Sequence, residues 1–189
     1  MSTKTSSNLR NFARKVRVFK NDIQMSVKPI SEEIATELES DINENFNLYK
    51  SLVSGTQIPA EDMDSHKIET EIHETSNGCT VRITGEHLLY DEYGTGDFGK
   101  TRPHPAHDKH GMNPYNSGSH IIHSANHGNY WFYNHSIYHG NTAGCFVFNS
   151  YMNMKDGKAK EISRRYINRL VKGFKKSGKG MVTIKRNGE

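Results

Sequence analysis

The stretch YDEYGTGDFGKTRPHP, Tyr90 to Pro105, joins an acidic, aromatic run to a loop rich in glycine and proline. From Gly94 to Gly128 the sequence shows neither a helical nor a strand periodicity, and glycine and proline recur throughout. A loop of this length inside a compact domain commonly has a function or forms an interaction arm. We therefore predict a long irregular loop over residues 94–128.

Gly94, Gly96 and Gly99 meet the spacing G-x-G-x-x-G, which binds the pyrophosphate of a dinucleotide when a helix follows the last glycine. No helical pattern follows here, and Pro103 and Pro105 oppose a helix nearby. The sequence therefore predicts no cofactor at this turn.

Three amphipathic helices are predicted from apolar residues that recur three and four positions apart. The first is basic, with the stripe Leu9, Phe12, Ala13, Val16 and Phe19. The second begins with Ser31 as its N-cap, carries acidic residues outside the stripe Ile34, Leu38, Ile42, Phe46 and Tyr49, and ends before Gly55 and Pro59. The third has a basic outer face, a break near Gly157 and the stripe Ile162, Tyr166, Leu170 and Phe174.

Strands are predicted between these helices. Alternating apolar residues on both sides of Asn77-Gly78 indicate a β-hairpin, because Asn-Gly suits its tight turn. The runs NYWFYN and SIYHGN are each expected to add a strand to a sheet that shares the core of the hairpin, and MVTIK to form a last short strand. The order of elements predicts an α+β fold: a mostly antiparallel sheet, packed by the N-terminal helices and a long C-terminal helix.

Length and composition favour one domain over residues 1–189. We expect a helical part over 1–53, a sheet with the long loop over 67–150, and a C-terminal helix and strand over 151–189. Only 33% of the residues are hydrophobic and no apolar run approaches about 18 residues, so no membrane segment is expected. The two cysteines, Cys79 and Cys145, are typical of a reducing compartment and are interpreted as small buried residues.

The net charge of +4 conceals a segregation of charge along the chain. Residues 29–50 are acidic, whereas residues 1–28 and 155–186 are basic. Oppositely charged regions on copies of one protein favour a directional assembly surface. Contact with nucleic acid and plain solvated helix faces are the alternative interpretations.

Eight of the eleven histidines lie between positions 104 and 139, which raises the possibility of a metal site or a histidine-based nuclease. The region lacks a cysteine pair, an H-E-x-x-H pattern and enough carboxylates to complete a closed zinc site. Cys145 follows Gly144 within an apolar run, which is untypical of an activated nucleophile. We therefore predict no metal, cofactor or catalytic residue, and keep a metal-binding or nucleic-acid-binding module and a nuclease as alternatives.

The stretch LLYDEYGTGDFGKTRPHP, followed by the aromatic run YWFY, the turn HGNTAGCFVF and a basic C-terminal helix, resembles the neck proteins of tailed bacteriophages. These are also described as tail-completion, head–tail joining or minor capsid and tail components. The resemblance covers roughly residues 79–175. It rests on Glu92, Tyr93, Gly94, Thr95 and Gly96, then Gly99, Pro103, His104 and Pro105, then Trp131, Tyr133, Gly140, Ala143, Phe146 and Phe148.

The resemblance implies a structural virion protein without enzymatic activity. About six or twelve copies would form or complete a ring between the capsid connector and the tail tube, next to other neck, connector and tail-tube proteins. It would be made in the host cytoplasm and end in the virion neck, in possible contact with passing DNA and without a membrane. The acidic helix and the basic C-terminal helix would meet between neighbouring subunits. The interface is expected to include Tyr90, Glu92, Tyr93, Gly94, Thr95, Gly96, Phe98, Pro103, His104, Pro105 and Trp131.

Overall fold

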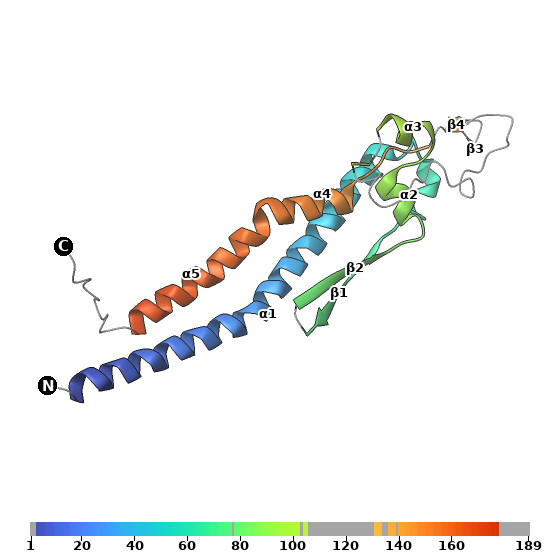
Figure 1. The fold of residues 1–189 in the computed structure, drawn as a ribbon. Helices are drawn as coiled ribbons and strands as arrows, with labels where there is room; N and C mark the ends of the chain where they lie inside the picture. Colours follow the sequence, from blue (N-terminus) through green and yellow to red (C-terminus); the bar gives the residue numbers. More distant parts are fainter. Residues whose placement is uncertain are drawn as a thin grey trace, which may run out of the picture.

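The structure is a computed structural model that describes residues 3–76, 78–102, 104–105, 131–133, 136–138 and 140–177. The predicted α+β class is confirmed, although the sheets are small. Figure 1 shows two long helices side by side, with a β-hairpin alongside the longer one and the other short strands gathered with short helices at one end. In chain order the elements are α1 (Thr3–Val53), the 3-10 helix η1 (Ala60–Asp62), β1 (Glu69–Thr75), β2 (Gly78–Thr84), α2 (Leu88–Tyr93), α3 (Gly96–Thr101), β3 (Trp131–Tyr133), β4 (Ser136–Tyr138), α4 (Phe146–Asn153), the π-helix η3 (Met154–Lys158) and α5 (Ala159–Ser177).

Helix α1 is one continuous helix, so the prediction of two helices divided before Ser31 was wrong. Pro29 lies inside α1, where a proline removes one backbone hydrogen bond at a cost of about 3 kcal/mol. Helix α5 contacts α1 on both sides of this residue. Phe174 packs on Phe19 with ring centroids 4.8 Å apart, and Arg165 pairs with Glu33. These contacts hold the two halves of α1 in one helix.

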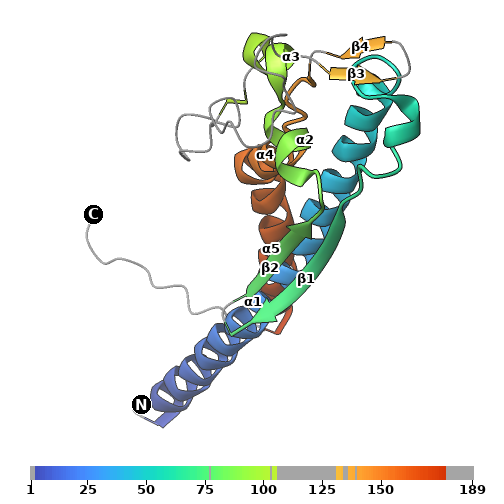
Figure 2. The same ribbon diagram turned by 90° about the vertical axis from the view of Figure 1, so that its right-hand side faces the viewer.

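The hydrophobic core forms where α1 packs against both the β1–β2 hairpin and α4–α5 (Figure 1 and Figure 2). Phe146 is fully buried, with its ring centroid 5.0 Å from that of Phe46 and 6.1 Å from that of Tyr49. The predicted stripe of the acidic segment supplies most of the α1 side of this core. Three of its members, Ile42, Phe46 and Tyr49, are buried there, and Val53 of α1, which was not predicted, joins them.

The predicted hairpin is confirmed, with β1 and β2 antiparallel and Thr75 opposite Gly78. The strands β3 and β4 also exist, but they pair with each other, Trp131 opposite Tyr138, and do not join the hairpin. The prediction of a shared sheet was therefore wrong. A connection as short as theirs costs little entropy to close, so local pairing is favoured over pairing with a distant hairpin. The predicted strand MVTIK lies outside the described residues.

The predicted C-terminal helix is confirmed as α5, and the predicted break near Gly157 takes the form of the π-helix η3. At this point the basic and acidic segments meet within one chain. The Nζ atom of Lys158 lies 2.9 Å from a carboxylate oxygen of Glu37 and 2.8 Å from one of Asp41. Part of the charge complementarity that the resemblance assigned to neighbouring subunits is thus used within one chain.

The segment around Gly94 is more regular than predicted. Helices α2 and α3 lie immediately before and after it, so the expectation of no helix near Pro103 was wrong. Helix α3 ends at Thr101, and Arg102 has φ −131° and ψ 72°. These angles lie outside the helical region, because the ring of Pro103 disfavours a helical conformation for the residue before it. The proline therefore ends the helix without preventing it.

Candidate functional site

The acidic pair of the quoted stretch lies in the interior, at the end of α2. Asp91 is 1% exposed, and its Oδ1 atom accepts a hydrogen bond of 3.0 Å from the hydroxyl of Tyr49. The Nδ1 atom of His66 lies 2.8 and 2.9 Å from its two carboxylate oxygens. A buried carboxylate needs such partners, because an unpaired charge in the interior costs several kcal/mol. Asp91 thereby ties α2 to α1 and to the segment after η1.

Asn141 joins this cluster from a distant part of the chain. Its Nδ2 atom donates to the hydroxyl of Tyr49 at 2.6 Å and to the carbonyl of Tyr90 at 3.0 Å. Its Oδ1 atom accepts the hydroxyl of Thr95 at 2.5 Å, and its carbonyl accepts the backbone N–H of Thr95 at 2.8 Å. One buried asparagine therefore fixes the turn before α4 to both α2 and the EYGTG segment.

Glu92 caps α4 from outside that helix. Its carboxylate accepts the backbone N–H groups of Val147 and Phe148, each at 3.0 Å. These are first-turn N–H groups, which have no partner within a helix, and the positive end of the helix favours a negative charge. His104 is 2% exposed, and its Nε2 atom lies 3.0 Å from the same carboxylate. The residues Glu92 and His104 of the motif therefore stabilise the start of α4.

Two glycines allow the backbone segments to approach closely. Gly94 has φ 77°, and a Cβ atom there would lie 2.6 Å from the backbone nitrogen of Ala143. Gly140 has φ 94°, and a Cβ atom there would overlap the carbonyl oxygen of Thr95. Only glycine adopts such angles without strain and leaves this space. The close contact between the EYGTG and HGNTAG segments therefore explains why Gly94 and Gly140 are glycines.

The chemistry of this cluster is that of a structural network. Burial, together with the charge of Asp91, raises the pKa of Tyr49 far above its usual value, so the phenol keeps its proton. Burial and the nearby Glu92 raise the pKa of Cys145 to about 11, which opposes formation of the thiolate that a cysteine nucleophile requires. Both cysteines are free and half-buried.

The metal hypothesis concerns mainly residues outside the described part of the chain, since most of the clustered histidines lie there. Among the described residues, no group of three or more histidine, cysteine, aspartate or glutamate side chains is placed to hold a metal ion. His66 does not belong to the histidine cluster of the sequence and stacks on His87, with ring centroids 4.3 Å apart.

The predicted interface residues divide by exposure. Glu92, Gly94, Gly96 and His104 are buried within the chain, Tyr90, Tyr93 and Thr95 are half-buried, and Phe98 and Pro105 are exposed. Pro103 and the side chain of Trp131 lie outside what the structure describes. The buried members position the surrounding backbone, and the exposed ones remain the predicted contact surface.

Three members of the cluster were not predicted from the sequence: Tyr49, His66 and Asn141. Tyr49 was assigned to an apolar stripe, His66 stands apart from any motif, and Asn141 lies inside the HGNTAG turn without having been singled out. Asp91 was the available signal, because a carboxylate inside the run LLYDEY needs a buried partner.

Comparison with known proteins gave no family model, no curated protein and no solved structure that matches this chain. None of the described helices combines the length and the apolar character needed to cross a bilayer.

Proposed function

We propose that this protein is a structural component of the neck of a tailed bacteriophage, where copies of it form or complete a ring between the capsid connector and the tail tube. The partners are other copies of the chain and the adjoining neck, connector and tail-tube proteins. The proposal starts from the sequence resemblance, whose separate motifs EYGTG, RPHP and HGNTAG contact one another in a single buried cluster.

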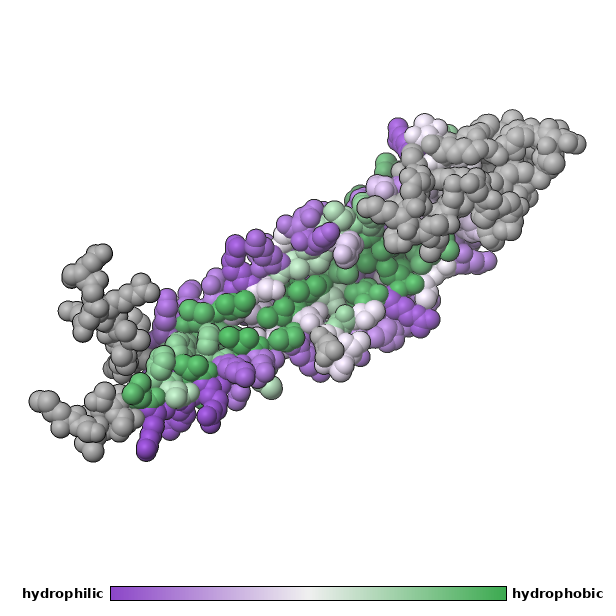
Figure 3. Space-filling model, viewed as in Figure 1, coloured by the Kyte–Doolittle hydropathy of each residue, from purple (hydrophilic) through white to green (hydrophobic). Residues whose placement is uncertain are grey.

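The observation that carries the proposal is the number of exposed apolar side chains on the N-terminal half of α1. Seven large hydrophobic residues there are at least 40% exposed: Leu9, Phe12, Val16, Val18, Ile23, Met25 and Val27. Figure 3 shows hydrophobic residues running along the helices as a band that reaches this end of the molecule. By their spacing, all of these residues except Val18 and Met25 share one side of α1, and a contiguous apolar face is typical of an assembly interface.

The basic face of α5 is proposed to contribute to the lumen through which DNA passes. Lys172, Lys175 and Lys176 are exposed at the end of this helix. Lysines at such a surface interact with phosphates irrespective of base sequence. Replacing all three by glutamine is expected to preserve assembly and to impair passage or binding of DNA. If assembly and DNA passage are both unchanged, the lumen assignment is wrong.

Native mass spectrometry of the full chain tests the ring. The expected spectrum contains one closed oligomer with a mass that is a whole multiple of 21.5 kDa and no stoichiometric metal. Electron microscopy of the same sample is expected to show rings. A monomer that carries about one metal ion per chain and nicks DNA would contradict the proposal and favour the nuclease alternative. Tight, salt-dependent DNA binding by an isolated monomer would instead favour a nucleic-acid-binding module.

A further inference from the structure

The N-terminal part of α1 presents an apolar face that the described part of the chain leaves uncovered. Leu9, Phe12 and Val16 are 61%, 49% and 43% exposed, and their spacing places them on one side of the helix. The next residue of this stripe, Phe19, packs on Phe174 near the end of α5. The uncovered face therefore begins where the described part of α5 ends.

Basic side chains border this face. Arg10 and Arg17 are seven residues apart, so they project from the same side of α1, and Lys20 lies one turn beyond Arg17. All three are exposed, and none makes an ion pair with another described residue. An occupant of this face must therefore combine apolar surface with negative charge.

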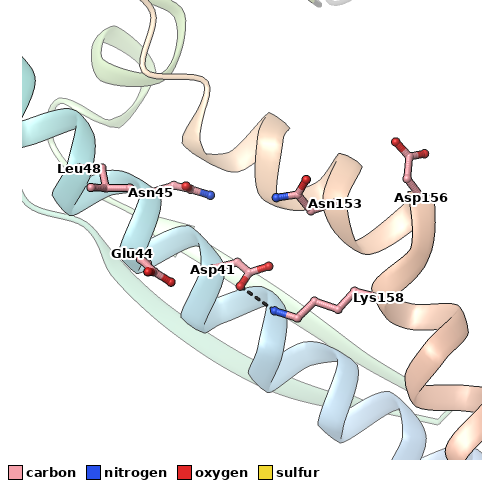
Figure 4. A pocket seen from close by; sticks show the side chains of 7 residues that line it. All are labelled: Asp41, Glu44, Asn45, Leu48, Asn153, Asp156 and Lys158. Atoms are coloured by element: carbon pink, nitrogen blue, oxygen red, sulfur yellow. Dashed lines mark hydrogen bonds and ion pairs between the residues drawn. The ribbon is translucent and has the colours of Figure 1, made fainter.

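A groove between α1 and the α4–η3 segment carries negative charge, and its volume is about 490 Å³. Its lining is mainly polar, with Leu48 as the apolar member. Figure 4 shows Asn45 of α1 and Asn153 of α4 pointing toward one another across the groove, with Lys158 reaching Asp41 at one end. Glu44 and Leu48 of α1 and Asp156 of η3 also line it. Glu44 and Asp156 are exposed and make no ion pair with a described residue, whereas Lys158 at one end is held by Asp41.

Apolar surface at the groove comes from α1. Leu48, which lines the groove, is 58% exposed, and Leu52, one turn further along the same side of α1, is 74% exposed. The groove and its border thus offer two unpaired carboxylates beside apolar surface. This composition complements the basic, apolar face of residues 9–20.

We propose that residues 9–20 of α1 dock into this groove of a second copy of the chain. Within one chain the contact is impossible, because residues 16 and 44 of the continuous helix α1 are about 42 Å apart at 1.5 Å per residue. Pairing of two N-terminal segments with each other would bring like charges together. The groove of another copy is the surface that avoids both problems.

The contact is head to tail, so each added copy leaves one N-terminal segment and one groove open until a ring closes. The inference rests on the proposed function, in which it is the junction between neighbouring subunits of the ring. The contact also assigns the segregated charges of the sequence a role in assembly, in addition to the ion pairs that they form within the chain.

Charge reversal of the full chain tests the contact. Glu44→Lys with Asp156→Lys reverses the groove, and Arg10→Glu with Arg17→Glu reverses the N-terminal segment. Each double variant is expected to raise the dissociation constant between subunits roughly tenfold or more in sedimentation and native mass spectrometry. A chain that combines all four substitutions is expected to assemble again, because every groove then finds a segment of opposite charge.

A matched control reverses Glu61 and Glu86 to lysine, since both are exposed and lie away from the groove. It is expected to assemble like the unaltered chain. The inference is overturned if the groove and segment variants assemble like this control, or if the chain with all four substitutions fails to assemble while remaining folded.

Disulfide cross-linking identifies the occupant directly. In a chain with Cys79 and Cys145 replaced by serine, Val16→Cys and Asn45→Cys are expected to form a cross-link between two copies. As a control, the chain that carries Val16→Cys without Asn45→Cys is expected to stay uncross-linked. A cross-linked dimer of that control chain would show that the N-terminal segments pair with each other, and would overturn the contact.

The outcomes separate this inference from the proposed function. Rings that persist in both reversal variants would overturn the groove contact and leave the neck assignment intact. The unaltered chain could also stay monomeric at its highest soluble concentration and yet join rings of another neck protein. This result would likewise overturn the groove contact and leave the neck assignment intact. A monomer that acts on or binds DNA alone would overturn both.

Discussion

The cap that Glu92 provides to α4 leads to a quantitative prediction for Glu92→Gln. The glutamine has nearly the same shape, but it has one acceptor oxygen in place of two and carries no charge. The two N–H groups of Val147 and Phe148, each 3.0 Å from the carboxylate, can then no longer both be satisfied. The amide group would also place donors opposite donors at this buried position.

The expected loss of stability follows from these contacts. A hydrogen bond to a charged group contributes about 1.5–3 kcal/mol, and a carboxylate at a helix N-terminus contributes about 0.3–1 kcal/mol. Since at least one such bond and the charge are lost, Glu92→Gln is expected to lower the free energy of unfolding by about 2–4 kcal/mol. In urea, this corresponds to a midpoint lower by roughly 1–2 M.

Glu86→Gln is the matched control, because Glu86 is exposed, makes no ion pair with a described residue and lies outside the proposed contact between copies. It is expected to change the free energy of unfolding by less than about 0.5 kcal/mol. Hydrogen exchange adds a local measurement: the amides of Val147 and Phe148 should exchange faster in Glu92→Gln only. Equal midpoints for the two variants would refute the assignment of Glu92 as the cap.

Three further predictions concern the same region. Gly94→Ala is expected to destabilise the fold by about 2–4 kcal/mol in urea unfolding, because the φ of residue 94 is positive and the added Cβ atom would overlap Ala143. In the control Gly173→Ala the added Cβ atom has no neighbour within 4 Å, so the change is expected to be neutral or stabilising. Cys145 in the folded chain is expected to react with iodoacetamide more slowly than an unfolded cysteine at pH 8, with a rate that rises toward pH 11; a fast reaction at pH 8 would contradict its raised pKa. Above about pH 10 the unfolded chain releases the proton of Tyr49, whereas the folded chain keeps it. The free energy of unfolding should therefore fall by about 1.4 kcal/mol per pH unit above about pH 10. Tyr49→Phe should show a shallower decline in unfolding curves measured at alkaline pH.

The buried cluster and the exposed helix face have different consequences for an assembly. Asp91, Glu92 and Asn141 fix the relative positions of α1, α2 and α4 within one copy. The groove between α1 and α4 therefore has a defined shape before any partner binds. A preformed groove lowers the entropic cost of docking, which suits repeated addition of identical copies.

Local sequence signals determined much of the secondary structure. Apolar spacing of three and four residues determined the helical faces of α1 and α5, and Asn77-Gly78 determined the hairpin, because these signals depend on neighbouring residues alone. The break near Gly157 was also predictable from the sequence. The segregation of charge was visible too, although its use in ion pairs such as Lys158 with Asp41 was not.

Only the tertiary structure decided the features that depend on distant contacts. Pro29 stays inside a continuous helix because α5, more than a hundred residues later, packs on both sides of it. Asp91 and Glu92 are buried because Tyr49, His66 and the start of α4, all distant in the sequence, supply their partners. The sequence by itself determined which segments are helices and strands, since periodicity and turn chemistry are local. Which charges lie inside and which apolar faces remain open was decided by packing between segments, since burial depends on what the rest of the chain covers.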